Sequence, residues 1–186
     1  SALGFYVVFK KARLKMNKAI ILAFLFVAGF SSAAGAAGDA PALVSAHGAW
    51  KAHFFRDGKA KVCFVAAQPE KQEGNFKKRG EVFFFVTRWA SAADKNVISM
   101  SGGYEFKPSS PVIVKVDNVA FPLVTEGETA WSRDAAADDA ILAAMKKGKS
   151  MTVKGTSIKG TETTDTYSLK GISAAVAAAA KECGKP

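Results

Sequence analysis

Two cysteines and two histidines are the residues of this chain whose types could support nucleophilic or metal chemistry. A thiol such as that of Cys63 becomes a nucleophile when a base such as His47 or His53 removes its proton, and the same side chains can bind a metal ion. The two histidines stand six residues apart on an expected strand, which matches no known zinc pattern. We therefore expect these residues to form neither a catalytic site nor a metal site, and we expect no bound cofactor.

Paired carboxylates and clustered cations offer two further kinds of chemistry. Glu126 and Glu128 would share one face of an extended segment, as a general acid and base can, but they stand in a Thr-Glu-Gly-Glu-Thr turn that favours solvated acids. Lys77, Lys78 and Arg79 could bind phosphates or sulfated sugars. The simpler interpretation is a solvated loop, residues 68–80, beside a strand. The chain contains no Gly-rich phosphate loop, nucleophile elbow, paired CxxC or HExxH motif.

Aromatic residues could line a ligand-binding surface, although a Phe-rich β-protein buries most of them in its core. The candidates for such a surface are Trp50, Trp89, Trp131, Tyr104 and Phe106. Among them, the stretch Tyr104-Glu105-Phe106-Lys107 follows two glycines and is the best candidate for an exposed aromatic loop.

The first 36 residues have the three parts of a secretory signal peptide. Basic residues between Lys10 and Lys18 precede an uncharged apolar run, residues 19–30, and small residues then lead to a cleavage site at Ala34-Gly35-Ala36. A transmembrane anchor is the alternative, but the run is shorter than the ~20 residues that a spanning helix needs. Met16 opens a more usual signal peptide, which would make residues 1–15 an upstream extension. We expect a mature chain, residues 37–186, that is periplasmic or secreted and has no stable membrane span.

The net charge does not indicate a nucleic-acid-binding protein. The chain of 186 residues carries 26 Lys+Arg against 16 Asp+Glu, a formal charge of +10, and five of the cations precede residue 37. The remaining balance is 21 minus 16, or +5, and it is spread along the chain. Export also changes how the two cysteines are interpreted, because thiols outside the cytosol are normally oxidised. We expect a structural disulfide between Cys63 and Cys183.

Alternating apolar and polar residues predict a series of strands joined by short turns. The first hairpin turns at Asp57-Gly58, which supplies the positive φ angles of a tight turn, and a second turns at Asp117-Asn118. Residues 81–89 are apolar on both faces, as in a central strand covered on both sides. The expected strands are residues 47–55, 61–66, 81–89, 96–100, 111–116, 119–124, 151–158 and 163–169. They predict a single all-β domain, residues 37–186, built as a β-sandwich or barrel-like antiparallel sheet.

Two helices complete the expected domain, one internal and one C-terminal. The internal helix runs from about Ala135 to Lys147, after a capping Asp134 and before Gly148. The second spans Ile172 to Cys183, and its apolar spacing places Cys183 on the face turned toward the sheet. The disulfide would then join the terminal helix to the second strand.

Several short motifs resemble the bacterial invasion-associated locus B family. These are Gly103-Tyr104-Glu105-Phe106-Lys107, Phe121-Pro122-Leu123, Gly127-Glu128-Thr129-Ala130-Trp131, Ala144-Met145-Lys146-Lys147-Gly148 and the region 161–171. The resemblance covers nearly the whole mature chain, including Trp50 and both cysteines. It implies an exported β-rich protein of the periplasm or outer surface, and some relatives are linked to host-cell invasion. The family has no established active site to transfer to this chain.

The resulting functional hypothesis is a non-enzymatic exported protein that binds a partner, which is unknown, through its β-sheet surface. The opposing class is a small periplasmic enzyme, which would show a polar cleft with converging ionisable groups. A third class, an envelope-stability or chaperone-like factor, would show a large exposed apolar patch. The sequence does not rank these classes.

Overall fold

The computed structural model describes residues 40–92 and 95–184. The expected signal peptide and its cleavage site lie outside these described residues. Within them, β-strands alternate with short turns, and the helices are one internal helix, one C-terminal helix and a single 3-10 turn. This confirms the all-β fold class with its two helices.

The strands of the first half, in chain order, are β1 (Ala42–His47), β2 (Trp50–Asp57), β3 (Ala60–Ala67), β4 (Lys71–Gly74), β5 (Phe83–Trp89) and β6 (Val97–Ser101). The strands of the second half are β7 (Val112–Val116), β8 (Val119–Glu126), β9 (Thr129–Trp131), β10 (Ser150–Thr156) and β11 (Glu162–Ser168). The two helices are α1 (Ala135–Lys147) and α2 (Ile172–Cys183).

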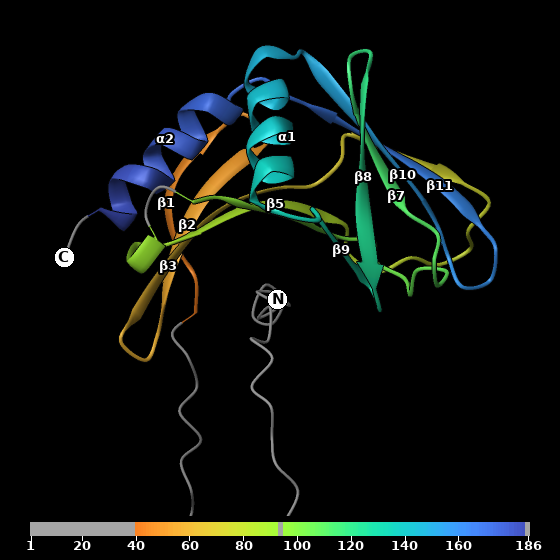
Figure 1. Ribbon diagram of the computed structural model, residues 1–186, viewed down its shortest axis with the longest axis horizontal. Coiled ribbons are helices and arrows are strands. Elements are labelled where there is room, and N and C mark those ends of the chain that lie inside the picture. Colours follow the sequence, from red (N-terminus) through yellow and green to blue (C-terminus); the bar gives the residue numbers. More distant parts are fainter. Residues whose placement is uncertain (1–39, 93–94, 185–186) are drawn as a thin grey trace, which may run out of the picture.

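The described strands form one antiparallel sheet in the order β1-β2-β3-β5-β6-β9-β8-β7-β10-β11-β4. The strand order has its edges at β1 and β4, and the sheet bends so far that its two halves pack on each other: Trp50 of β2 stacks on Tyr167 of β11, with ring centroids 6.5 Å apart. Long strand β8 pairs with β7 through its first half and with β9 through its last residues, so it joins the two halves of the sheet. Figure 1 shows the sheet arching, with β7, β10 and β11 turned up beside the helices.

The main core lies between the inner face of this bent sheet and the two helices. Trp50, Phe84, Met100 and Tyr167 are buried there together with Ile141 of α1 and Ile172 of α2, among other residues. Helix α2 lies against β1, β2, β3 and β5, while α1 lies against β6 and β8. Both helices therefore cover the same face of the sheet.

Three strands were not expected from the sequence. Residues 42–46 form most of β1, because Gly48 adopts a positive φ and turns the chain between β1 and β2 where one strand was expected. Strand β4 lies in the expected loop 68–80 and pairs with β11, and β9 pairs with β6 and β8. These strands are short or lack a strong alternation of apolar and polar residues. They are therefore recognised as strands only by their hydrogen-bonded pairing with neighbouring strands.

Helix α1 begins and ends where local chemistry indicates. The carboxylate of Asp134 accepts a hydrogen bond from the backbone N–H of Ala137, at 2.9 Å, and caps α1. Gly148 ends this helix by donating its backbone N–H to the carbonyl of Ala144. Asp138, in the first turn, is buried and accepts hydrogen bonds from the Ile98 N–H and the Ser132 hydroxyl, which ties α1 to β6. In the part of the chain that the structure describes, neither helix has the length and apolar character to cross a membrane.

Candidate binding surface

The sheet face turned away from the helices carries a second apolar surface. Side chains alternate between the two faces of a strand, so the odd-numbered residues of β5 point to this face. The residues opposite them in the neighbouring strands point to the same face. We call this surface the open face. Its apolar and aromatic members are Leu43, His53, Phe55, Val62, Phe64, Ala66, Phe83, Phe85, Trp89, Val97, Val124 and Trp131.

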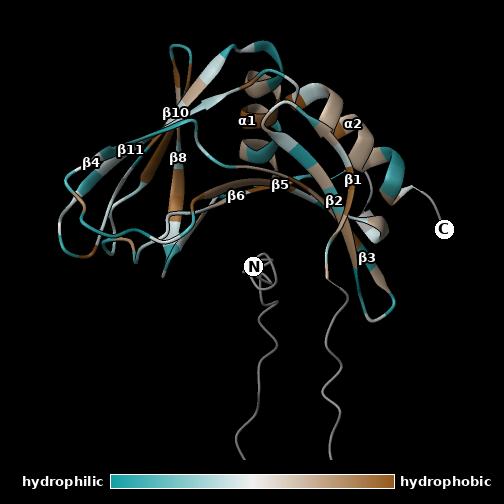
Figure 2. Cartoon of the chain, turned by 180° about the vertical axis from the view of Figure 1, so that it is seen from behind, coloured by the Kyte–Doolittle hydropathy of each residue, from teal (hydrophilic) through white to brown (hydrophobic). Residues whose placement is uncertain are grey.

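The strand register aligns these side chains in rows across the sheet. One row runs from Leu43 through His53, Phe64 and Thr87 to Val97. A second row runs from Ala66 through Phe85, Ser99 and Trp131 to Val124. The open face therefore extends across seven strands, from β1 at the edge to β8, and the buried hydroxyl residues Thr87 and Ser99 stand between its apolar members. Figure 2 shows the hydrophobic colour along β5, β6 and β8.

Aromatic rings form the centre of the open face. The imidazole of His53 stacks on Phe64 with 5.1 Å between ring centroids, and Phe55 and Phe85 each meet Phe64 edge-on at 6.2 Å. Phe83 lies 5.8 Å from Phe85. Phe64 and Phe85 are buried among these neighbours, while Phe55 and Phe83 are half-buried. Such contacts stabilise the sheet and leave an apolar centre.

Charged residues occur only toward the ends of strands on the described part of the open face. Lys51 is the second residue of β2, Asp57 is its last, and Glu126 is the last residue of β8. Burial lowers the pKa of His53, and the nearby Lys51 charge lowers it further against a raising backbone hydrogen bond. His53 is therefore predominantly neutral at pH 7, so the centre of the open face carries no charge. The exposed apolar side chains Leu43 and Val124, 59% and 57% accessible, mark its two margins.

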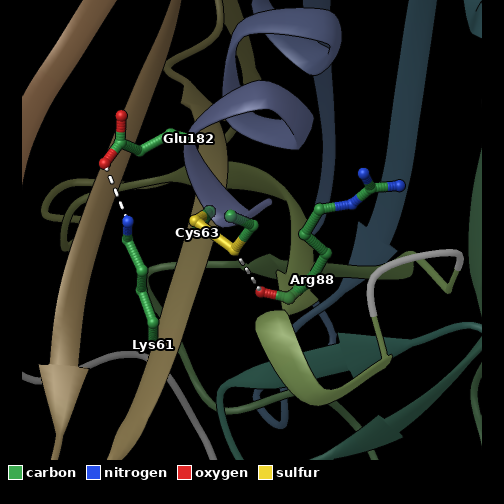
Figure 3. The surroundings of a disulfide bond; sticks show 5 residues. Lys61, Cys63, Arg88 and Glu182 are labelled. Atoms are coloured by element: carbon green, nitrogen blue, oxygen red, sulfur yellow. Dashed lines mark hydrogen bonds and ion pairs between the residues drawn. A yellow bond between two sulfur atoms is a disulfide. The ribbon is translucent and has the colours of Figure 1, made fainter. Parts of the chain in front are cut away.

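Cys63 and Cys183 form a disulfide on the opposite side of the sheet, with Cα atoms 5.8 Å apart and both residues buried. Figure 3 shows this bond beside the ion pair between Lys61 and Glu182, whose Nζ and Oε1 atoms are 2.9 Å apart. Lys61 also lies over the ring of Phe54. The disulfide and the ion pair together join the end of α2 to β3. Because Cys63 is oxidised, it is no free nucleophile.

The two histidines are not brought together with a thiol. The Nε2 atom of His47 lies 3.0 Å from the hydroxyl of Ser45, and His53 faces the open face while Cys63 faces α2. Across residues 40–92 and 95–184, no group of three or more His, Cys, Asp or Glu side chains could hold a metal ion.

The interpretation of residues 77–79 as part of a solvated cationic loop is wrong for Arg79. Its guanidinium donates to both carboxylate oxygens of Asp165, at 2.6 and 2.7 Å, and to the carbonyl of Gly102 at 2.8 Å. It also lies against the ring of Tyr104, 4.9 Å from the centroid. Lys77 and Lys78 are exposed as expected. Arg79 is thus a structural cation that holds the loop to β11, and not a phosphate ligand.

The expectation of an exposed aromatic loop at residues 104–107 is also wrong. Phe106 is buried in the core, and the hydroxyl of the half-buried Tyr104 lies 2.7 Å from that of Thr163. The ring of Phe106 occupies the space where a side chain at Gly102 would lie, since a Cβ there would clash with the ring. Gly102 thus makes room for a buried aromatic residue, while Gly103 lies against the backbone of Gly80.

The other candidates divide between core and surface. Trp50 is fully buried and donates its indole N–H to the carbonyl of Ser168 at 2.8 Å. Trp89 and Trp131 are half-buried members of the open face. Glu126 and Glu128 are exposed on either side of the β8–β9 turn. The open face itself was not identified from the sequence, although the double-sided apolar pattern of residues 81–89 signalled it.

The fold and the buried Cys63–Cys183 disulfide together define a class of protein. In this class, one curved antiparallel sheet is covered by two helices on one face, and a disulfide links a helix to the sheet. Within this class, the chain belongs to the Invasion associated locus B (IalB) protein family, whose model matches residues 50–180. This confirms the resemblance found in the sequence motifs.

One solved structure shows the same fold. The crystal structure of invasion associated protein B from Bartonella henselae matches with a TM-score of 0.54 and 21% sequence identity, covering 76% of this chain and 98% of that chain. Comparison with curated proteins gives no match.

Proposed function

We propose that this protein is an exported, non-enzymatic binding factor of the cell envelope or the secreted fraction, and that it engages its partner through the open face. Membership of the Invasion associated locus B family supports a role of this type. The disulfide supports an oxidising compartment such as the periplasm or the exterior.

The observation that carries the proposal is that the sheet is apolar on both faces while both helices cover one. Antiparallel sheets of small domains commonly present one apolar face to the core and one polar face to water. Here the second face carries an aromatic centre with no charge, bounded by Lys51, Asp57 and Glu126. An apolar surface with a polar rim is the usual anatomy of a protein-binding site.

A capture experiment with the mature chain, residues 37–186, tests this function. The protein is immobilised and incubated with envelope fractions, and the same is done with the double variant Leu43→Glu/Val124→Glu. Both side chains are exposed on the open face, so these changes leave the core intact. We expect the wild type to retain a specific partner. The variant should retain at least tenfold less of that partner.

Matched control variants come from exposed apolar residues elsewhere. Val119 and Ile158, 54% and 50% accessible, lie at the β7–β8 turn and after β10, outside the open face. The double variant Val119→Glu/Ile158→Glu should capture as much partner as the wild type. Equal loss in both double variants, or equal retention, would contradict binding through the open face.

A further inference from the structure

Strands β7, β10, β11 and β4 carry mostly polar side chains on the side turned away from the core. Figure 2 shows the hydrophilic colour along β4 and β11. The opposite side of β10 and β11 is buried, as the core residues Val153 and Tyr167 show. We call the polar side the threonine face. The strand register aligns it in three rows, which are Lys115, Thr152, Thr166 and Lys71, then Ile113, Lys154, Thr164 and Glu73, then Thr156 and Glu162.

We propose that the threonine face binds an anionic glycan, a linear chain of sugars that carry carboxylate groups. This site is additional to the open face and does not depend on the partner proposed there. Three features of the threonine face support it: a groove, a set of free hydroxyl groups and a line of unpaired cations.

A groove of about 310 Å³ lies on the threonine face, where β7, β10 and β11 meet. This volume is at the lower end of the range for small-molecule sites. The surface is hollowed because half-buried threonines stand between longer, exposed charged side chains. The proline and the isoleucine of the groove offer apolar contacts to the C–H groups of a sugar ring. The residues that line it include Pro111, Ile113, Lys154, Thr156, Glu162 and Thr164.

The threonine hydroxyls offer hydrogen bonds of the kind that sugars make. Thr152, Thr156, Thr164 and Thr166 are half-buried, and within residues 40–92 and 95–184 their hydroxyls have no hydrogen-bond partner. A hydroxyl donates one hydrogen bond and accepts others, as each sugar hydroxyl does. Threonine is also β-branched and has few rotamers, so holding these hydroxyls in place on a ligand costs little side-chain entropy.

Three exposed lysines follow the same strands: Lys115, Lys154 and Lys170. None of them forms an ion pair with the part of the chain that the structure describes. The backbone N–H of Leu169 donates to the carbonyl of Lys149, which places Lys170 beyond the start of β10. Lys170 therefore lies about six residues from Lys154 along the strands, or about 20 Å. A line of cations of this length suits a chain with several carboxylates better than a single anion.

The acidic residues of the threonine face give the site a direction. Glu73 is paired with Lys71, whose Nζ atom lies 2.8 Å from the carboxylate, so its charge is compensated. Glu162 lines the groove, where it accepts hydrogen bonds from sugar hydroxyls and repels a second carboxylate. The glycan therefore places hydroxyls in the groove and carboxylates toward Lys115 and Lys170. Charge alone or hydroxyls alone satisfy only part of this surface.

Calorimetric titration of the mature chain, residues 37–186, tests the site. The probe is oligogalacturonate, in which the rings carry both carboxylates and hydroxyls. Two probes of similar length are compared with it: a glucose oligomer has hydroxyls without charge, and a glutamate oligomer has charge without hydroxyls. We expect oligogalacturonate to bind at least tenfold more tightly than either. No binding of oligogalacturonate, or equal binding of one of the other probes, would overturn the proposal.

A charge-matched pair of variants tests the line of cations. The variant Lys115→Gln/Lys154→Gln/Lys170→Gln should bind oligogalacturonate at least tenfold more weakly than the wild type, because its three ion pairs are lost. A control variant removes the same charge from exposed lysines away from the threonine face and should lose less than twofold. This control is Lys59→Gln/Lys95→Gln/Lys181→Gln. Equal losses in the two variants would show attraction by net charge alone, which contradicts a site on the threonine face.

The variant Thr156→Val/Thr164→Val tests the hydroxyls of the groove. Valine keeps the β-branched shape and removes one hydroxyl at each position. We expect at least fivefold weaker binding of oligogalacturonate, with no change in the thermal unfolding temperature that would indicate a disturbed fold. Unchanged binding would refute the role of the groove and with it the proposal.

The open-face variant Leu43→Glu/Val124→Glu separates this site from the proposed function. It should bind oligogalacturonate as the wild type does, because both substitutions lie outside the threonine face. Loss of glycan binding in this variant would place the glycan on the open face and overturn the proposal. If the wild type binds oligogalacturonate but captures no envelope partner, the proposed function fails and the glycan site stands.

Discussion

Arg79 and Asp165 bring a full charge pair into the interior of the domain. Their side chains are 3% and 1% accessible, and the two guanidinium–carboxylate hydrogen bonds run parallel. Such a fork offsets much of the cost of removing both charges from water, but a single partner left behind has no compensation. The pair therefore contributes more to defining where loop 68–80 attaches than to net stability.

The single variant Asp165→Leu is expected to lower the free energy of unfolding by about 3–5 kcal/mol, because it leaves the guanidinium of Arg79 buried without its anion. The double variant Arg79→Met/Asp165→Leu replaces both charges by apolar groups and should lose less than half as much. Urea unfolding of the three proteins measures the difference. Equal losses in the single and double variants would show that the Arg79 charge is not the source of the cost.

The variant Cys183→Ser is expected to lower the free energy of unfolding by about 2–5 kcal/mol and to leave Cys63 as a free thiol. The two cysteines are 120 residues apart, so the bond encloses most of the described chain in one loop and strongly restricts the unfolded state. Thiol counting on the unfolded, unreduced protein should give none for the wild type and one for the variant. Two thiols in wild-type periplasmic material would contradict the bridge.

Helix α2 depends on one glycine as well as on its covalent bond. Gly171 precedes the helix with φ +96°, and a Cβ at this position would clash with the carbonyl oxygen of His47. Only glycine combines this conformation with so close an approach to the β1–β2 turn. This close contact between Gly171 and the β1–β2 turn fixes where α2 starts against the edge of the sheet.

The variant Gly171→Ala is expected to lower the free energy of unfolding by more than ~2 kcal/mol, because both backbone strain and a steric clash must be relieved. Gly160→Ala is the matched control, since Gly160 has φ +83° but open space around it. It should lose only about 1 kcal/mol from strain. Thermal or urea unfolding compares the two. A loss at Gly160 as large as at Gly171 would remove the steric contact with His47 as the cause.

For the molecule as a whole, the expected signal peptide and the disulfide both lead to the prediction of export. Mass spectrometry of the periplasmic or secreted protein should give an N-terminus within a few residues of Ala37, because signal peptidase cleaves after a small residue, here Ala36, that has another small residue, here Ala34, two positions before it. A mature protein that retains residues 20–30 would contradict this cleavage.

The sequence by itself determined the elements that depend on neighbours in the chain. Asp134 and Gly148 bounded α1, and the apolar spacing of residues 172–183 directed Cys183 toward the sheet. The β2–β3 hairpin was also expected, but it turns one residue later, at Gly58-Lys59, where Gly58 alone has a positive φ. Each of these signals acts over a few residues, through a cap, a turn angle or a helical period, so each can be recognised before any tertiary contact is known.

Only the tertiary structure decided which side chains meet across the sheet. Arg79 was expected to be solvated because its partner Asp165 lies 86 residues away, and β4 has no strand pattern of its own until β11 pairs with it. The open face arises in the same way, since Leu43, Phe64, Phe85 and Trp131 form one surface only through the register of five strands. Strand register is set by contacts distant in sequence, and a shift of one residue would move these side chains to the other face.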